Sequence, residues 1–161
     1  MKRKFTKQHR TNISRACKGR TTWSKGKKMP KESLYKNMKA HLKYDVDLAW
    51  LMKFEDVEKL KYLNKSISRK RDYQGFNNEI YCEYIEKFYN DKAFNYYFDK
   101  WVETGDKWIK PSLDHIEAKS NGGSKLVNNL QFLSWFENRA KNDISQVKWN
   151  EMKKNIKDYL L

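Results

Sequence analysis

The chain has 161 residues, enough for one modest domain with extensions, and its Lys and Arg outnumber its Asp and Glu so that the net charge is +15. It contains no run of about 18 apolar residues, which excludes a membrane span, and no apolar segment follows its basic first residues, which excludes a secretion signal. We therefore expect a cytoplasmic protein without a membrane partner.

The positive charge is concentrated at the N-terminus. Residues 1–44 hold 15 Lys or Arg and a single acid, Glu32, whereas the other 117 residues hold 20 Lys or Arg and 19 acids. Dispersed basic side chains bind nucleic acid because they release counterions from its phosphates. A membrane-surface helix would need a wide apolar face, which residues 1–44 lack. The sequence therefore predicts a basic nucleic-acid-binding arm over residues 1–44.

Two short segments of this arm resemble each other weakly, residues 5–20 and residues 29–44. Each is predicted to form a short helix, since Thr6 can cap the first and Pro30 fits the first turn of the second. A disordered basic tail has the same composition, so the sequence leaves both interpretations open.

Residues 45–107 are predicted to be helical and rich in aromatic residues. Apolar side chains recur at helical spacing over residues 46–72 and again over residues 79–103, with Gly75 in the connection between them. The aromatic stripe of the second helix is expected to pack in the core, because stacking on single-stranded nucleic acid would require exposed rings.

Residues 108–143 are predicted to form a strand, a polar loop, a second strand over 129–132 and a helix over 133–141. Ser145 is expected to cap a last helix, in a C-terminal region of residues 144–161. The predicted fold class is therefore α+β and mostly helical, with one small pair of antiparallel strands.

Polar residues at the end of the first strand have the chemistry of a hydrolytic site. Asp114 and His115 are neighbours, so their side chains leave the strand on opposite faces unless it bends. Asp114 and Asn138, from the following helix, offer oxygen atoms to a hard divalent cation such as Mg²⁺ or Mn²⁺. His115 would then stay off the metal and accept a proton from water.

This stretch resembles the HNH motif of the His-Me finger, or ββα-metal, endonucleases of phage and homing type. The resemblance implies His115 as general base, Asp114 and Asn138 as metal ligands, and Asn129 as the residue that braces the loop and orients the base. Asn128 is the alternative to Asn129 by a shift of one residue. The matching elements are Asp114-His115-Ile116, Gly122-Gly123, Asn129-Leu130-Gln131-Phe132-Leu133, and Asn138 with Lys141.

The chain departs from that family where many members carry two C-x-x-C zinc knuckles. It has only Cys17 and Cys82, and Ser134 and Glu137 stand where one Cys pair would fall, so no structural zinc is expected. Aromatic packing is expected to hold the finger instead, from Trp108, Phe132, Trp135 and Phe136.

The arm is similar, over residues 5–42, to the short modular DNA-binding repeats attached to homing-type nucleases. The similarity implies contacts with the phosphates of double-stranded DNA. The expected contacts are Arg10, Arg15, Lys18, Arg20, Lys25, Lys27 and Lys28 in the arm, with Lys119, Lys125, Arg139 and Lys141 in the finger.

The leading hypothesis is a metal-dependent DNA endonuclease. A non-enzymatic basic nucleic-acid-binding protein derived from a nuclease and a restriction endonuclease with the same finger are the alternatives. The recognition sequence, the oligomeric state, monomer or homodimer, and the choice between nicking and double-strand cleavage stay open.

Overall fold

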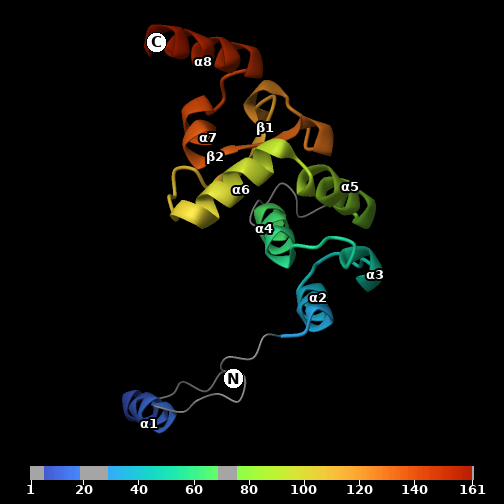
Figure 1. The fold of residues 1–161 in the computed structure, drawn as a ribbon, viewed down its shortest axis with the longest axis vertical. Coiled ribbons are helices and arrows are strands. Elements are labelled where there is room, and N and C mark those ends of the chain that lie inside the picture. Colours follow the sequence, from blue (N-terminus) through green and yellow to red (C-terminus); the bar gives the residue numbers. More distant parts are fainter. Residues whose placement is uncertain (1–5, 19–28, 69–75, 161) are drawn as a thin grey trace. The chain divides into compact units, whose positions relative to one another are not determined.

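A computed structural model describes residues 6–18, 29–68 and 76–160 of the chain (Figure 1). The fold is mostly helical with one two-stranded antiparallel sheet, as the sequence predicts. The chain divides into two compact units, Met1–Lys31 and Glu32–Leu161. Over the described ranges, no helix is both long enough and apolar enough to cross a bilayer.

The first unit contains α1 (Lys7–Cys17). The predicted cap is confirmed, because the Thr6 hydroxyl accepts a hydrogen bond from the His9 amide at 3.2 Å. The side chains from residue 6 to residue 16 are all exposed, so local contacts such as the Gln8–Asn12 hydrogen bond at 3.2 Å stabilise this helix. The predicted phosphate contacts Arg20, Lys25, Lys27 and Lys28 lie outside the described residues.

The second predicted repeat does not belong to a separate arm. It forms α2 (Lys31–Ala40), whose Tyr35 and Met38 are buried in the hydrophobic core of the larger unit, as is Tyr44 just after the helix. The Tyr35 hydroxyl donates a hydrogen bond to the Phe54 carbonyl. The expected boundary at residue 44 is therefore wrong, because α2 and Tyr44 contribute buried side chains to the core of the larger unit.

The predicted helical stretch 46–72 is described up to residue 68, and over that part it forms two helices, since two short polar caps divide it. Asp47 accepts from the Ala49 amide at 3.1 Å and starts α3 (Leu48–Leu51). Asp56 accepts from the amides of Glu58 and Lys59, at 2.8 and 3.1 Å, and starts α4 (Val57–Ser68).

The same correction applies to residues 79–103, which form α5 (Asn78–Tyr89) and α6 (Lys92–Thr104). Asp91 starts α6 by accepting from the Phe94 amide at 2.7 Å. The apolar periodicity continues across the break because both helices contribute to one core. An aspartate followed by helix-forming residues was the signal for each break.

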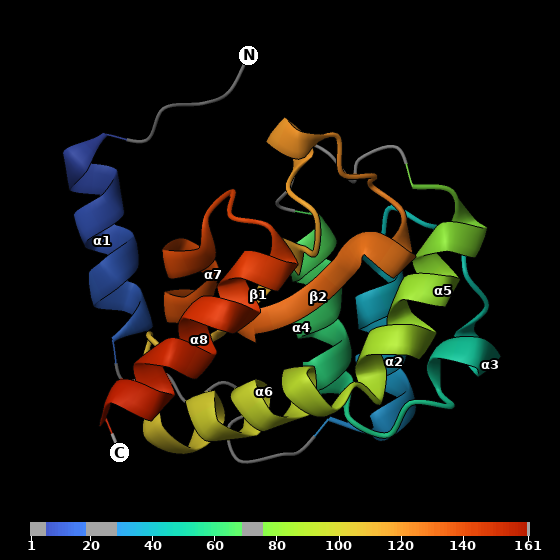
Figure 2. The same cartoon turned by 90° about the horizontal axis from the view of Figure 1, so that it is seen from above.

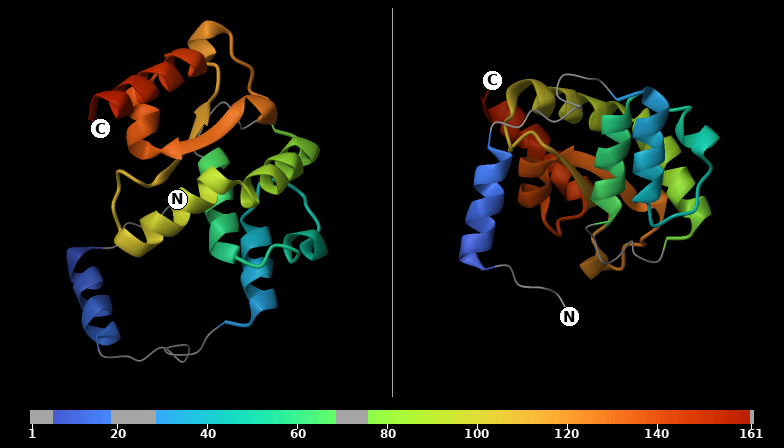
Figure 3. Two further views of the ribbon diagram at one scale, coloured as in Figure 1. Left: turned by 45° about the horizontal axis from the view of Figure 1, so that its top comes forward. Right: turned by 90° about the horizontal axis from the view of Figure 1, so that it is seen from below.

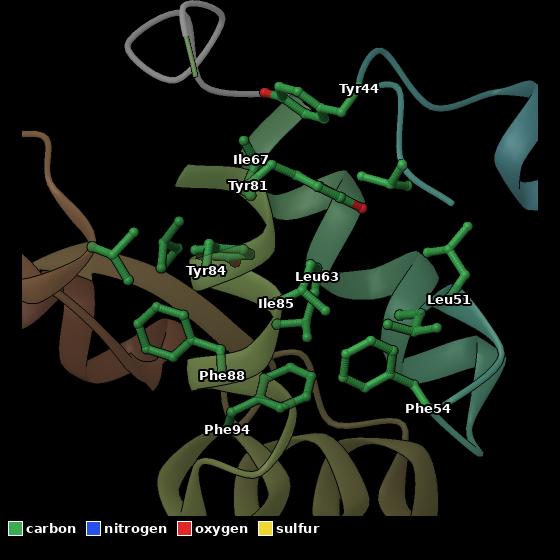
Figure 4. Packing of buried hydrophobic residues seen from close by; sticks show 14 of the residues in the cluster. Tyr44, Leu51, Phe54, Leu63, Ile67, Tyr81, Tyr84, Ile85, Phe88 and Phe94 are labelled. Carbon is green, nitrogen blue, oxygen red and sulfur yellow. The ribbon is translucent and has the colours of Figure 1, made fainter. Parts of the chain in front are cut away.

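The aromatic stripe packs in the core, as expected. Figure 4 shows Leu63 and Ile67 of α4 beside Ile85 and Tyr81 of α5. The fully buried side chains of α5 and α6 are Tyr81, Tyr84, Ile85, Phe88 and Phe94. Rings buried in this way cannot stack on nucleic-acid bases.

The sheet pairs β1 (Pro111–His115) with β2 (Leu130–Ser134), each shifted by a few residues from its predicted position. Phe132 of β2 faces α5 and α6, with its ring centroid 5.1 Å from that of Phe88 and 4.9 Å from that of Phe94. The opposite face of the sheet is covered by α7 (Trp135–Lys141) (Figure 2). The last helix, α8 (Gln146–Leu160), lies beyond α7 on the side away from α6 (Figure 1 and Figure 3).

Candidate functional site

Two side chains of α7 are joined to the outer edge of β1. Among the described residues the sheet has two strands, and none of these residues forms a strand that pairs with this edge. Asn138 Nδ2 donates to the Leu113 carbonyl at 3.1 Å, and Lys141 Nζ donates to the His115 carbonyl at 2.8 Å. Positions three apart on a helix share a face, so Asn138 and Lys141 fix α7 against β1 at two adjacent points.

Asp114 is buried on the sheet face that α7 covers. Its Oδ2 lies 3.1 Å from Lys141 Nζ and accepts a hydrogen bond from Gln131 Nε2 at 3.1 Å. Gln131 is the residue directly opposite Asp114 in the strand pairing, and its Nε2 also donates to Gln146 Oε1 at 2.7 Å. Both of these contacts go to Oδ2 of the carboxylate.

Lys141 was expected to contact a DNA phosphate, and its position in the structure corrects that expectation. Its side chain is 0% exposed, so its ammonium does not lie at the surface where a DNA phosphate could reach it. Taking an ammonium out of water is unfavourable unless a charge and hydrogen bonds compensate it, and the Asp114 carboxylate and the His115 carbonyl provide both. Lys141 is therefore an internal partner of the site rather than a phosphate contact.

Asn138 is held with its amide in a defined orientation. Its Nδ2 donates to Ser112 Oγ at 2.9 Å and to the Leu113 carbonyl at 3.1 Å. Because a carbonyl can only accept, the group facing Leu113 must be the amide nitrogen, and Oδ1 points elsewhere. Ser112 and Asp114 are two apart on β1 and lie on one face, so the structure brings Asn138 close to Asp114.

The side chains of Asp114 and Asn138 carry the kinds of oxygen atom that a hard divalent cation takes. A carboxylate oxygen and an amide oxygen are ligands that Mg²⁺ accepts, and Mg²⁺ keeps water or substrate oxygens in its other positions. Among the described residues, no group of three or more His, Cys, Asp or Glu that could hold a metal ion gathers in one place.

His115 is the last residue of β1 and is half-buried. It stands beside Asp114 at the point where the chain leaves the sheet for the loop that follows. Hydrogen bonds hold the backbone around it on both sides. Lys141 donates to its carbonyl, and the Ile116 amide donates to the Asn129 carbonyl at 2.8 Å.

The Asn129 side chain braces the loop that follows His115. Its Oδ1 accepts from the Glu117 amide at 2.9 Å, and its Nδ2 donates to the carbonyls of Glu117 at 3.1 Å and Ser124 at 2.7 Å. Asn128 is exposed, and Asn129 is the one of the two asparagines that makes these contacts. A single side chain thus closes both ends of the loop.

Gly123 is required where the loop turns back. A Cβ at this position would lie 1.9 Å from the Glu117 carbonyl oxygen, so no larger residue fits without moving the backbone. Gly122 has φ +84°, a left-handed conformation that favours glycine. The Gly-Gly pair in the sequence is thus explained by the fold of the loop.

A polar cluster stabilises the first turn of α7. It contains Ser134 and Glu137, the two residues that stand where the resemblance would place a Cys pair. The Ser134 hydroxyl accepts from the Glu137 amide at 3.0 Å, and Glu137 Oε2 accepts from the Ser134 amide at 3.2 Å, which is a capping box. Tyr97 of α6 donates to Glu137 Oε2 at 2.5 Å, and Lys153 of α8 lies 3.7 Å from Oε1. Glu137 therefore connects three helices.

This environment shifts two acid–base equilibria. Burial raises the pKa of Glu137, but the hydrogen bonds from Tyr97 and Ser134 and the charge of Lys153 outweigh burial and lower that pKa below its usual value of 4.5. Burial, followed by the hydrogen bond to Glu137, raises the pKa of Tyr97. The cluster thus favours an ionised Glu137 and a neutral Tyr97.

Aromatic packing stabilises residues 108–143 only in part. Phe132 is buried as expected, and the Trp108 and Trp135 rings meet edge to face at 5.0 Å. However, Trp108 is 47% exposed and Phe136 is 57% exposed, so they form a surface cluster rather than a core.

The remaining predicted phosphate contacts of the finger, Lys119, Lys125 and Arg139, are exposed. So are Arg10, Arg15 and Lys18 in the smaller unit. Sequence reasoning missed Ser112 and Gln131 as partners of Asn138 and Asp114. The signal for both was strand alternation, because Ser112 lies two residues before Asp114, and Gln131 is the polar residue between two apolar ones on β2.

Comparison with known proteins returns no relative: no family model matches the chain, and neither the curated proteins nor the solved structures contain a significant match.

Proposed function

We propose that this chain is a metal-dependent DNA endonuclease of the HNH type that hydrolyses phosphodiester bonds. The observation that carries the proposal is the docking of Asn138 on the face of β1 that holds Asp114. It places a carboxylate and an oriented amide next to the strand end that bears His115. The proposal also draws on the resemblance of this stretch to the HNH motif, on which the role of each residue is assigned.

In the proposed mechanism, His115 acts as general base. Its neutral imidazole accepts a proton from a water molecule, and the oxygen of that water bonds to phosphorus as the bond to the leaving 3′ oxygen breaks. The products carry a 5′ phosphate and a 3′ hydroxyl. A divalent cation bound by Asp114 and Asn138 would stabilise the negative charge on the leaving oxygen.

The other residues of the site take no direct part in the reaction and instead hold the reacting residues in place. Lys141 fixes the His115 carbonyl and the Asp114 carboxylate at once. Asn129 braces the loop that begins one residue after His115. A general base must be held within hydrogen-bond reach of its proton donor, so a rigid backbone on both sides of His115 suits this role.

One observation favours the second candidate, a nucleic-acid-binding protein without cleavage. The Lys141 ammonium at 3.1 Å already neutralises one oxygen of the carboxylate that a nuclease would use for its metal. A site in which Lys141 substitutes for the metal would bind DNA and leave it intact.

Incubation with supercoiled plasmid separates the two candidates. The nuclease proposal predicts nicked or linear plasmid with Mg²⁺, none with EDTA, and 5′-phosphate ends when the products are sequenced. The Asp114→Asn variant should require more Mg²⁺ than a control that changes a surface carboxylate, Asp158→Asn. Intact plasmid at every Mg²⁺ or Mn²⁺ concentration, with DNA binding preserved, would establish the binding protein instead.

A further inference from the structure

The structure contains a basic groove beside the candidate site. It has a volume of about 410 Å³ and runs along the outer edge of β1, where residues 111–113 line it together with Tyr62, Ser66, Lys107, Lys110 and Trp135. A smaller hollow adjoins it, lined by Tyr62, Lys65, Ser66, Trp101 and Lys110. No Asp or Glu is among the described residues that line either one.

The groove is continuous with the candidate site through Ser112. Ser112 is one of the residues that line the groove, and its hydroxyl accepts the hydrogen bond from Asn138 Nδ2 at 2.9 Å. At the other end, the Tyr62 hydroxyl donates to the Pro111 carbonyl at 2.5 Å and joins α4 to the start of β1. A ligand in the groove would therefore reach the residues that hold the proposed metal.

The lysines of the groove are accompanied by aromatic rings. Lys110 Nζ lies 4.8 Å from the ring centroid of Trp101 and 5.9 Å from that of Tyr62. Lys107 Nζ lies 5.2 Å from the ring centroid of Trp108. Within the part of the chain that the structure describes, neither lysine forms an ion pair, so both positive charges are available to an anionic ligand.

We propose that this groove binds the sugar–phosphate backbone of the DNA strand flanking the scissile bond, with Lys107 and Lys110 contacting phosphates. Ammonium groups beside aromatic rings suit a ligand that carries phosphates and flat bases. The volume suits a nucleotide-sized group. The inference rests on the proposed function and deepens it, because it assigns a path for the substrate on a surface that the resemblance does not assign.

The experiment measures binding without cleavage. A short fluorescein-labelled DNA duplex is titrated with protein in EDTA at several salt concentrations, and the affinity is plotted against salt on logarithmic axes. Loss of two phosphate contacts, in the Lys107→Gln/Lys110→Gln variant, should reduce the slope by about 1.8. A Lys107→Arg/Lys110→Arg variant keeps both charges and should keep the wild-type slope.

The matched control removes two charges elsewhere. Lys53 and Lys92 are exposed and line neither hollow, so Lys53→Gln/Lys92→Gln should change the slope much less. An unchanged slope in the groove variant, or an equal fall in the control, would overturn the inference. The binding test is done in EDTA, so a negative result there would not bear on whether the wild-type protein cleaves plasmid. Conversely, a protein that shows the predicted salt slopes but does not cleave plasmid would refute the proposed function and not the binding of DNA in the groove.

Discussion

At the scale of single residues, the candidate site depends on a buried cation. Replacing Lys141 by Met should leave the Asp114 carboxylate buried without its charge partner, which lowers the free energy of unfolding by about 3–5 kcal/mol. Urea denaturation measures this loss. The Lys141→Met/Asp114→Asn double variant should be more stable than the single one, since it removes the uncompensated charge. Lys36 pairs with Glu32 at 2.6 Å but is 61% exposed, so Lys36→Met should have little effect. Equal losses for the two lysines would refute the internal role of Lys141.

The loop offers a second test at this scale, because two adjacent asparagines differ in their contacts. Asn129→Ala removes three hydrogen bonds to loop backbone and should lower the free energy of unfolding by about 1–3 kcal/mol. It should also speed hydrogen exchange at the Glu117 amide. Asn128→Ala should stay within about 0.5 kcal/mol of the wild-type protein, as surface substitutions do. A larger loss of stability for Asn128→Ala than for Asn129→Ala would mean that Asn128, and not Asn129, makes the hydrogen bonds to the loop.

At the scale of elements, Glu137 makes stability depend on pH. Its folded pKa lies below 4.5, so its ionised form stabilises the fold above about pH 4.5. That contribution is lost as the pH falls through the lower, folded pKa. The melting temperature of wild-type protein should therefore exceed that of Glu137→Gln at neutral pH, and the two should converge in acid. A gap that stays constant across this range would show that the carboxylate charge is not what joins α6, α7 and α8.

Element boundaries show what the sequence can and cannot predict. The strand–loop–strand–helix order and the Thr6 cap were predictable, because polar caps, Gly-Gly and strand alternation are local signals. The breaks at Asp56 and Asp91 were also signalled by local caps, but an apolar periodicity that continues across them concealed both. The burial of Lys141 was not predictable, because it depends on how α7 packs against β1, and a lysine near the end of a helix is usually exposed.

At the scale of the whole molecule, the boundary between the two units gives a prediction about truncation. Residues 1–28 carry 11 Lys or Arg and no acid, and every core side chain named above follows them. Deleting residues 1–28 should leave the melting temperature nearly unchanged while weakening DNA binding and flattening its salt dependence. Deleting residues 1–44 removes Tyr35, Met38 and Tyr44 as well, each worth about 1.5–3 kcal/mol when buried.

The longer deletion should therefore consume much of a typical net stability of about 5–15 kcal/mol and give a protein without a cooperative thermal transition. Circular dichroism on the two truncated proteins separates these outcomes. If the protein that lacks residues 1–44 melts cooperatively at the wild-type temperature, α2 is not needed for the core and belongs with the basic arm instead.

The most direct test of the account is the effect of His115→Ala on single-turnover cleavage of a DNA duplex in Mg²⁺, measured together with the affinity for that duplex. Loss of a general base should slow cleavage by about 10²-fold to 10⁴-fold, while the dissociation constant stays close to that of the wild-type protein. His41→Ala, which changes an exposed histidine of the same unit, should match the wild-type protein in both measurements. A His115→Ala protein that cuts at the wild-type rate, or one that fails to bind the duplex, would contradict the assignment of this histidine as the base.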